Sequence, residues 1–171
     1  SRQVRVVHFF TAGFKEMNLE GARMEAEIVR IAGQGGVRVI GPNGMGLYCP
    51  ESGLSFFSGF PKESGQVAFL SQSGGNAAQF VLLGSRWGLR FSKVVSYGNA
   101  SDLNETDFLE YCAEDNSTKI IGSYIEGVKD GERFFRVLKE TSDKKPTIII
   151  KGGRTRAGTR AIGSHTGSLM G

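Results

Sequence analysis

The feature that most constrains the fold of this chain is an alternation of short apolar segments with segments of helical periodicity. Four apolar segments of strand length, rich in β-branched and aromatic residues, begin near Val67, Val94, Ile120 and Thr147. Between them lie segments of about ten residues whose apolar side chains recur at helical spacing. This alternation predicts a parallel sheet with helices on both faces. Right-handed crossovers then favour an α/β fold of the flavodoxin-like, doubly wound kind.

A shorter strand–helix–strand unit precedes this region. A β-branched and aromatic run over residues 4–10 predicts a strand, residues 19–32 have the apolar spacing of a helix, and residues 37–40 predict a second strand. Glycines after residue 32 end the helix. A unit this short is expected to be the end of a larger domain, so we interpret the chain as a fragment.

The chain is therefore expected to divide into three parts. Residues 1–50 form the end of the first domain, residues 51–65 a linker, and residues 66–171 a second domain truncated at its C-terminus. Pro50 and Pro61 mark the linker, where periodicity disappears. Its phenylalanines predict an ordered, packed connection.

Composition excludes several classes of function. Lysine and arginine number 21 against 17 acidic residues, and no basic stripe alternates with aromatic residues, so no nucleic-acid partner is expected. No apolar run approaches the ~20 residues that span a bilayer, so we expect no membrane and a cytoplasmic location. Cys49 and Cys112 are isolated in the sequence and are expected to be reduced, and no set of zinc ligands is present.

Polar residues follow each strand of the predicted second domain. Because the carboxyl ends of parallel strands lie at one edge of a sheet, Ser71, Ser73, Asn99, Glu126 and His165 are expected at a common rim. Ligands of doubly wound proteins bind there.

The Ser–Gly turn after the first of these strands has the features of an anion site. Gly74 and Gly75 leave backbone amides accessible at the start of a helix, where the helix dipole and the hydroxyls of Ser71 and Ser73 favour a phosphate. Many strand-to-helix turns contain serine and glycine without binding a ligand, so this alternative stays open.

His165 lies in a run of small and hydroxylated residues that includes Ser164 and Thr166. Such a histidine can act as a general base, a metal ligand or a nucleophile, although a lone loop histidine is usually only solvated. Glu126 could orient the imidazole or stabilise its charged form, or be an ordinary surface acid. Arg154 belongs to a basic cluster, with Lys151, that suits a phosphorylated ligand or a solvated surface equally well.

The motifs of several enzyme classes are absent. The sequence has no GxSxG nucleophile elbow and no Walker loop. A histidine that faces a phosphate-binding helix start, with a carboxylate partner and arginines nearby, suits phosphoryl transfer through a phosphohistidine.

Four motifs carry a resemblance to a known family. GPNGMGLYCP, GQVAFLSQSGGN, YIEGVKDGERF and KGGRTRAGTRAIGSHTGSL, in this order, resemble the α part of the ADP-forming acyl-CoA synthetases, relatives of succinyl-CoA synthetase. The resemblance implies a Rossmann-like CoA-binding domain followed by a flavodoxin-like ligase domain. It also implies a reaction that interconverts acyl-CoA, ADP and phosphate with carboxylic acid, CoA and ATP, through an acyl phosphate and a phosphohistidine.

The resemblance assigns roles to individual residues. The phosphorylated histidine corresponds to His165, its partner to Glu126, and the phosphate-binding helix start to Ser71, Ser73 and Gly74. The family's segments near CoA and the thioester correspond to Gly13, Phe14, Lys15, Pro42, Asn43 and Gly44. Asn99, Arg154, Ser164 and Thr166 are candidates for supporting roles.

One residue departs from the family pattern, which commonly has cysteine where this sequence has Gly44. ADP or ATP and Mg²⁺ are expected on an ATP-grasp domain or subunit that partners this chain, and an oligomer is expected. The alternative is a non-catalytic CoA-binding regulatory module of the same fold, as fused to protein acetyltransferases, which needs neither His165 nor Glu126.

Overall fold

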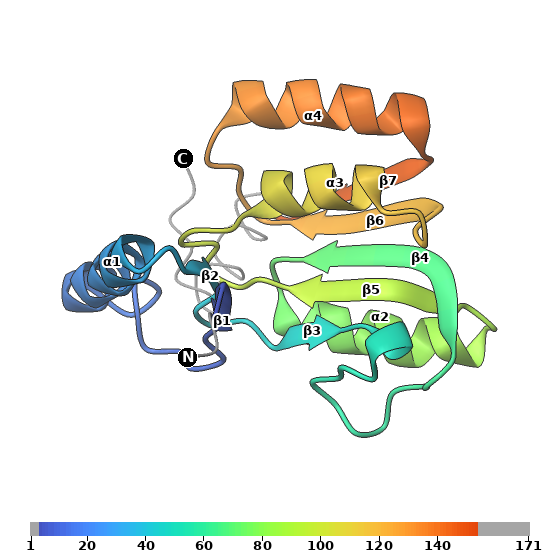
Figure 1. The fold of residues 1–171 in the computed structure, drawn as a ribbon, viewed down its shortest axis with the longest axis horizontal. Helices are drawn as coiled ribbons and strands as arrows, with labels where there is room; N and C mark the ends of the chain where they lie inside the picture. The colour runs from blue at the N-terminus through green and yellow to red at the C-terminus, as the bar shows by residue number, and fades with distance from the viewer. Residues whose placement is uncertain (1–3, 154–171) are drawn as a thin grey trace.

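The computed structural model describes residues 4–153. Their strands form two sheets that lie side by side, with helices packed against them (Figure 1). In the first, β1 (Val6–His8) pairs in parallel with β2 (Arg38–Ile40), and α1 (Leu19–Gln34) connects them. The second sheet has the order β3-β5-β4-β6-β7. Its strands are β3 (Gly46–Tyr48), β4 (Ser64–Ser71), β5 (Phe91–Ser96), β6 (Ile120–Ile125) and β7 (Thr147–Lys151).

The predicted parallel sheet is confirmed. β4 pairs in parallel with both β5 and β6, and β6 pairs in parallel with β7. Counted from β4, this is the 2-1-3-4 order of the flavodoxin-like topology. The chain leaves β4 towards one side of the sheet and returns to the other side at β6, so the strand order reverses between these two neighbours.

Three helices cover the second sheet, namely α2 (Gly74–Arg86), α3 (Glu105–Glu114) and α4 (Gly131–Lys144). Side chains of β4 alternate between the two faces. Leu70 lies in the core beneath α3 and α4, whereas Phe69 lies in the core beneath α2. Helices therefore lie on both faces, as the sequence predicts (Figure 1).

A side chain caps the first turn of each of these three helices. Asn104 and Asp107 form a reciprocal capping box at the start of α3, and Asp130 accepts a hydrogen bond from the Arg133 backbone N–H at the start of α4. Ser73 caps α2 by accepting from the Asn76 backbone N–H. These local signals fix the three turns from which the helices leave the sheet edge.

Residues 46–48 differ from the expectation. The sequence assigns them to the end of the first domain, yet as β3 they pair antiparallel with β5 and extend the second sheet. The segment after them includes a 3₁₀ turn over Pro50–Ser52 and packs as the sequence predicts. Its Phe60 is buried, with ring centroids 5.0 Å from those of Tyr48 and Phe56. Three residues are too few for a strand periodicity to be visible.

The two units share a core. Ile40 of β2 lies in the same apolar cluster as Leu70, Val95 and Tyr97 of the second unit. The Leu103 backbone N–H donates to the Val39 carbonyl oxygen at 3.1 Å. The relative placement of the two units is therefore fixed by packing and by main-chain hydrogen bonds.

Both cysteines are free thiols, as expected, and burial raises the pKa of Cys112 to about 12. Within residues 4–153, no helix is long and apolar enough to cross a membrane.

Asp115 at the end of α3 gives a testable pH dependence. Burial raises the pKa of its carboxyl, but hydrogen bonds from Lys93, Thr118 and Ser117 outweigh burial and hold the pKa well below its usual range. A depressed folded-state pKa adds stability above the unfolded pKa near 4, and this stability is lost as the pH falls towards the folded pKa.

We therefore expect Asp115→Asn to lower the free energy of unfolding by about 1–2 kcal/mol at pH 7. The difference from wild type should persist to about pH 5 and shrink below pH 4. Urea unfolding at several pH values measures it. Asp143→Asn, at an exposed position of α4, is the matched control. A difference that does not change between pH 7 and pH 3 would contradict the role of ionised Asp115.

Candidate active site

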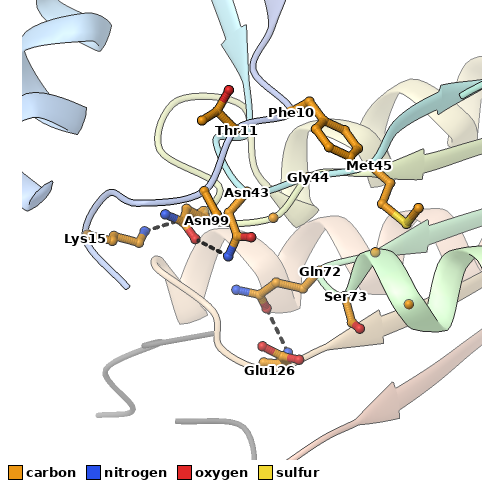
Figure 2. Close-up of a pocket in the computed structure, with 14 residues that line it drawn as sticks. Phe10, Thr11, Lys15, Asn43, Gly44, Met45, Gln72, Ser73, Asn99 and Glu126 are labelled. Atoms are coloured by element: carbon orange, nitrogen blue, oxygen red, sulfur yellow. Dashed lines mark hydrogen bonds between the residues drawn. The ribbon is translucent and has the colours of Figure 1, made fainter. Parts of the chain in front are cut away.

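A cavity of about 680 Å³ lies at the carboxyl ends of the central strands, between the two units (Figure 2). The first unit lines it with the 10–15 segment and with the turn before β3. The second unit contributes the turns after β4, β5 and β6. The lining residues of the first unit are Phe10, Thr11, Ala12, Lys15, Asn43, Gly44 and Met45; those of the second are Gln72, Ser73, Gly74, Gly75, Gly98, Asn99 and Glu126.

The start of α2 faces this cavity through Ser73, Gly74 and Gly75. The free amides of its first turn and the positive end of its dipole suit an anion. At Gly74 a Cβ would lie 2.5 Å from the Met45 Cγ, so a larger residue here would displace the Met45 side chain. The predicted anion site therefore has an accessible helix start in the structure.

The two serines of the turn have different places. Ser71 is fully buried, and its hydroxyl donates to the Ser73 carbonyl oxygen at 2.6 Å. It shapes the turn and does not line the cavity, in contrast to the expectation that both hydroxyls face a ligand. The Ser73 hydroxyl lies at the rim and caps the helix.

Gln72 is a site residue that sequence reasoning missed. Its side-chain oxygen accepts a hydrogen bond from the Glu126 backbone N–H at 2.8 Å (Figure 2) and another from the Gly127 backbone N–H at 3.1 Å. Its own backbone N–H donates to the Tyr124 carbonyl oxygen at 3.0 Å. The signal that could have found it is its position directly after β4, where the strand order reverses.

Glu126 follows β6 and is 3 % exposed, so it is not the ordinary surface acid that the sequence left open. Its carbonyl oxygen accepts from the Lys151 ammonium at 2.6 Å. Burial, together with the nearby Glu126 carboxylate, raises the pKa of the Tyr124 hydroxyl. Glu126 thus lines the cavity, and hydrogen bonds to its own N–H and carbonyl oxygen hold its main chain in place.

Asn99 follows β5 at the same rim, as predicted, but its side chain has other partners than a phosphate. Its amide donates to Glu16 Oε2 at 2.6 Å and to Glu25 Oε2 at 2.8 Å, both in the first unit. A role as a direct phosphate ligand does not fit these contacts.

The Gly13–Lys15 loop forms one wall through Lys15 alone. Gly13 has a φ of +107°, which favours glycine, and the Glu16 carboxylate accepts from the backbone N–H groups of Gly13 and Phe14. The Phe14 carbonyl oxygen packs so close to Gly21 of α1 that a Cβ there would lie 2.1 Å away. Gly13 and Phe14 therefore shape the loop, and Lys15 reaches the cavity.

Asn43 and Gly44 line the cavity next to this loop, whereas Pro42 is buried and does not line it. A Cβ at Gly44 would lie 2.6 Å from the Ser96 carbonyl oxygen, a main-chain atom. The His8 Nε2 is 2.9 Å from the Gly44 carbonyl oxygen. In this backbone, Gly44 cannot be replaced by cysteine without a main-chain shift.

Four predicted site residues lie outside the described residues, namely Arg154, Ser164, His165 and Thr166. In residues 4–153, no group of three histidine, cysteine or acidic side chains could hold a metal ion. The described geometry thus supplies an anion-binding helix start, a buried carboxylate and a lysine around one cavity.

Comparison with known proteins agrees with this arrangement. The succinyl-CoA ligase-like flavodoxin domain family matches residues 64–171. Acetate–CoA ligase [ADP-forming] I of Archaeoglobus fulgidus is 46% identical over 162 residues, which are 94% of this chain and 24% of the relative. The α subunit of acetate–CoA ligase [ADP-forming] II of Pyrococcus furiosus is 44% identical over 168 residues, 98% of this chain and 37% of the relative.

A solved structure shows the same fold. Acetyl-coenzyme A synthetase 1 of Ca. Korarchaeum cryptofilum, in complex with phosphate and ADP, superposes with a TM-score of 0.87 at 38% identity. The match covers 99% of this chain and 37% of that one. The chain thus spans about a quarter to just over a third of the relatives it matches. With its matched domain, sheet order and cavity, the chain belongs to the succinyl-CoA ligase-like family that includes the ADP-forming acetate–CoA ligases.

Proposed function

We propose that this chain is the CoA- and phosphate-handling part of an ADP-forming acyl-CoA synthetase. The observation that carries the proposal is the cavity in which the start of α2 and the buried Glu126 face each other between the two units. The complete enzyme interconverts acyl-CoA, ADP and phosphate with carboxylic acid, CoA and ATP. CoA is a substrate here, and no step requires a metal ion held by the described residues.

The first step suits the start of α2. A phosphate oxygen attacks the thioester carbonyl carbon, the carbon–sulfur bond breaks, and CoA leaves as the thiol with an acyl phosphate as product. The amides of Gly74 and Gly75 and the helix dipole stabilise the phosphate oxygens during this step. The proposal places the reacting thioester beside Asn43 and Gly44, whose backbone forms the adjacent wall.

The second step uses His165, the proposed nucleophile. An imidazole nitrogen attacks phosphorus, the bond to the acyl oxygen breaks, and the carboxylic acid leaves. Glu126 would accept a hydrogen bond from the other ring nitrogen and stabilise the positive charge that develops on the ring. Its burial strengthens this effect, because little water is present to screen the carboxylate.

The last step needs a partner. The phosphohistidine passes its phosphoryl group to ADP, and we place ADP and Mg²⁺ on an ATP-grasp domain or subunit. Among the relatives, one is an α subunit, which by its name functions with another subunit, and one solved neighbour contains ADP. Arg154, Ser164 and Thr166 are proposed to support the histidine loop, and the assembly is proposed to be an oligomer.

The histidine role predicts a specific label. In the complete synthetase, Mg-ATP should place one acid-labile, base-stable phosphate on His165, because phosphoramidate bonds hydrolyse in acid. His165→Ala should abolish both the label and net ATP synthesis from acetyl-CoA. Peptide mapping by mass spectrometry distinguishes His165 from His8, the other histidine of the chain. Unchanged labelling and turnover in His165→Ala would refute the proposed role of His165.

The proposed role of the Glu126 carboxylate predicts a slower phosphoryl transfer when its charge is removed. Glu126→Gln keeps the size of the side chain and removes its charge, so it should slow phosphoryl transfer to histidine by 100-fold or more, about 3 kcal/mol. Rapid-quench measurement of phosphohistidine formation is the assay. Glu132→Gln, at an exposed position of α4, is the control. A wild-type rate in Glu126→Gln would leave the histidine role intact and remove Glu126 from it.

A further inference from the structure

Asn99 joins the two units that form the cavity. It lies in the turn that follows β5 and is 6 % exposed. Its backbone N–H donates to the Pro42 carbonyl oxygen at 2.8 Å, and its own carbonyl oxygen accepts from the Lys15 ammonium. Both main-chain groups of this second-unit residue are therefore bound to the first unit.

The side chain of Asn99 extends this connection to three more groups. Its NH₂ donates to Glu16 Oε2 at 2.6 Å and to Glu25 Oε2 at 2.8 Å. Its side-chain oxygen accepts from Asn43 Nδ2 at 3.4 Å, as Figure 2 shows. Glu16 comes from the loop after β1, Glu25 from α1 and Asn43 from the turn after β2. One neutral amide thus links three segments of the first unit to the end of β5.

The two acidic side chains around Asn99 require a neutral hydrogen-bond donor at this position. Burial raises the pKa of Glu16, but hydrogen bonds from Asn99, Gly13 and Phe14 outweigh it and lower the pKa. Glu16 is therefore a carboxylate at neutral pH, and a carboxylate only accepts hydrogen bonds. An amide donates to both acids, whereas an aspartate of the same shape would add a third negative charge.

Lys15 is held by the same cluster. Its ammonium lies 3.3 Å from Glu25 Oε1, and it contacts the Asn99 carbonyl oxygen. Among the described residues that line the cavity, Lys15 is the one with a positively charged side chain. Figure 2 shows it entering from a different side than Ser73 at the start of α2. An anionic ligand in the cavity thus meets Lys15 on one side and the helix start on another.

We propose that Asn99 is a positioning residue for this reaction: its amide, shared between Glu16 and Glu25, sets the spacing of the two cavity walls and the place of Lys15. The inference rests on the proposed function and deepens it. It gives the supporting role expected of Asn99 a definite form, because the polar groups of Asn99 are bound to the first unit. The ligand that depends on it is an anionic one, an acyl-CoA or phosphate, that meets Lys15.

The test is an exchange of charge at constant shape, made in the complete synthetase. Asn99→Asp places a carboxylate against Glu16 and Glu25, and like charges at this distance repel. At pH 8 we expect kcat/KM for acetyl-CoA, with ADP and phosphate, to fall by about tenfold or more, with most of the loss in KM. Asn99→Ala should also lose activity, but without a pH dependence of its own.

Lower pH should restore the aspartate variant. The introduced carboxylate lies against two others, and like charges favour its protonated form. It therefore takes up a proton as the pH is lowered to about 5.5 and again provides a hydrogen-bond donor. The loss relative to wild type should then shrink severalfold. The charged side chains that line the two cavities beside this cluster are Lys15, Glu105, Glu126 and Lys129, and Asp102 acts on Lys129.

A second substitution keeps the test valid if Asn99→Asp folds poorly. In Asn99→Asp with Glu16→Gln the amide and the carboxylate change places, and the total charge equals that of wild type. The new amide oxygen can still accept from the Gly13 and Phe14 N–H groups, while its NH₂ donates to the new carboxylate. We expect at least half of the lost kcat/KM, on a logarithmic scale, to return at pH 8.

Two control variants repeat the same chemical changes elsewhere. Asn104→Asp lies at the cap of α3, where aspartate caps as well as asparagine, and Glu27→Gln lies at an exposed position of α1. Both should behave as wild type. Wild-type kcat/KM in Asn99→Asp would overturn the inference, as would equal, pH-independent losses in Asn99→Asp and Asn99→Ala.

The unfolding temperature separates this inference from the proposed function. If the wild-type synthetase forms no ATP from acetyl-CoA, ADP and phosphate, the proposed function fails. The positioning role of Asn99 is then tested by the unfolding temperatures at pH 8. Asn99→Asp should then lower the unfolding temperature, and Glu16→Gln added to it should raise it again. Equal unfolding temperatures in all three proteins would refute the proposal that Asn99 holds the two units together through Glu16 and Glu25.

Discussion

The site depends on the bridge that Gln72 makes between the turns after β4 and β6. These two strands are neighbours, but the chain leaves them towards opposite faces of the sheet, to α2 and to α4. The backbone N–H groups of Glu126 and Gly127 would lack a strand partner where the chains diverge. The side-chain oxygen of Gln72 accepts from both. A buried N–H without an acceptor costs about 1–3 kcal/mol, so the bridge fixes the main chain that carries Glu126 opposite the start of α2.

The parts of the fold that the sequence predicts are those with local signals. The strands from β4 to β7 show as apolar runs, and the caps at Asn104 and Asp130 show by residue type and spacing. Their parallel order follows from the crossover rule. The placement of β3 does not follow, because Gly46–Tyr48 pairs with a strand more than forty residues away and has no periodicity of its own. Such a pairing is decided by tertiary packing.

The candidate site divides in the same way. Topology alone brings Ser73, Asn99 and Glu126 to one edge, and the structure confirms this placement. The inward turn of Ser71 and the partners of Asn99 could not be predicted, because they depend on side-chain rotamers and on docking of the two units. The hydrogen bonds from Asn99 to Glu16 and Glu25 join residues 83 and 74 positions apart. The meeting of His165 with Glu126 stays a prediction.

The antiparallel strand β3 has a consequence for where this protein can be divided. The matched family domain begins at residue 64, whereas β3 ends at Tyr48. A protein cut at residue 64 would leave the outer edge of β5 with unpaired main-chain donors and acceptors, and such an open edge recruits strands from other molecules. Tyr48 and Phe60 also cover Phe91 and Val94 in the α2-side core, so the same cut would expose aromatic surface. A fragment that keeps this sheet edge and this core intact therefore has to begin before Gly46.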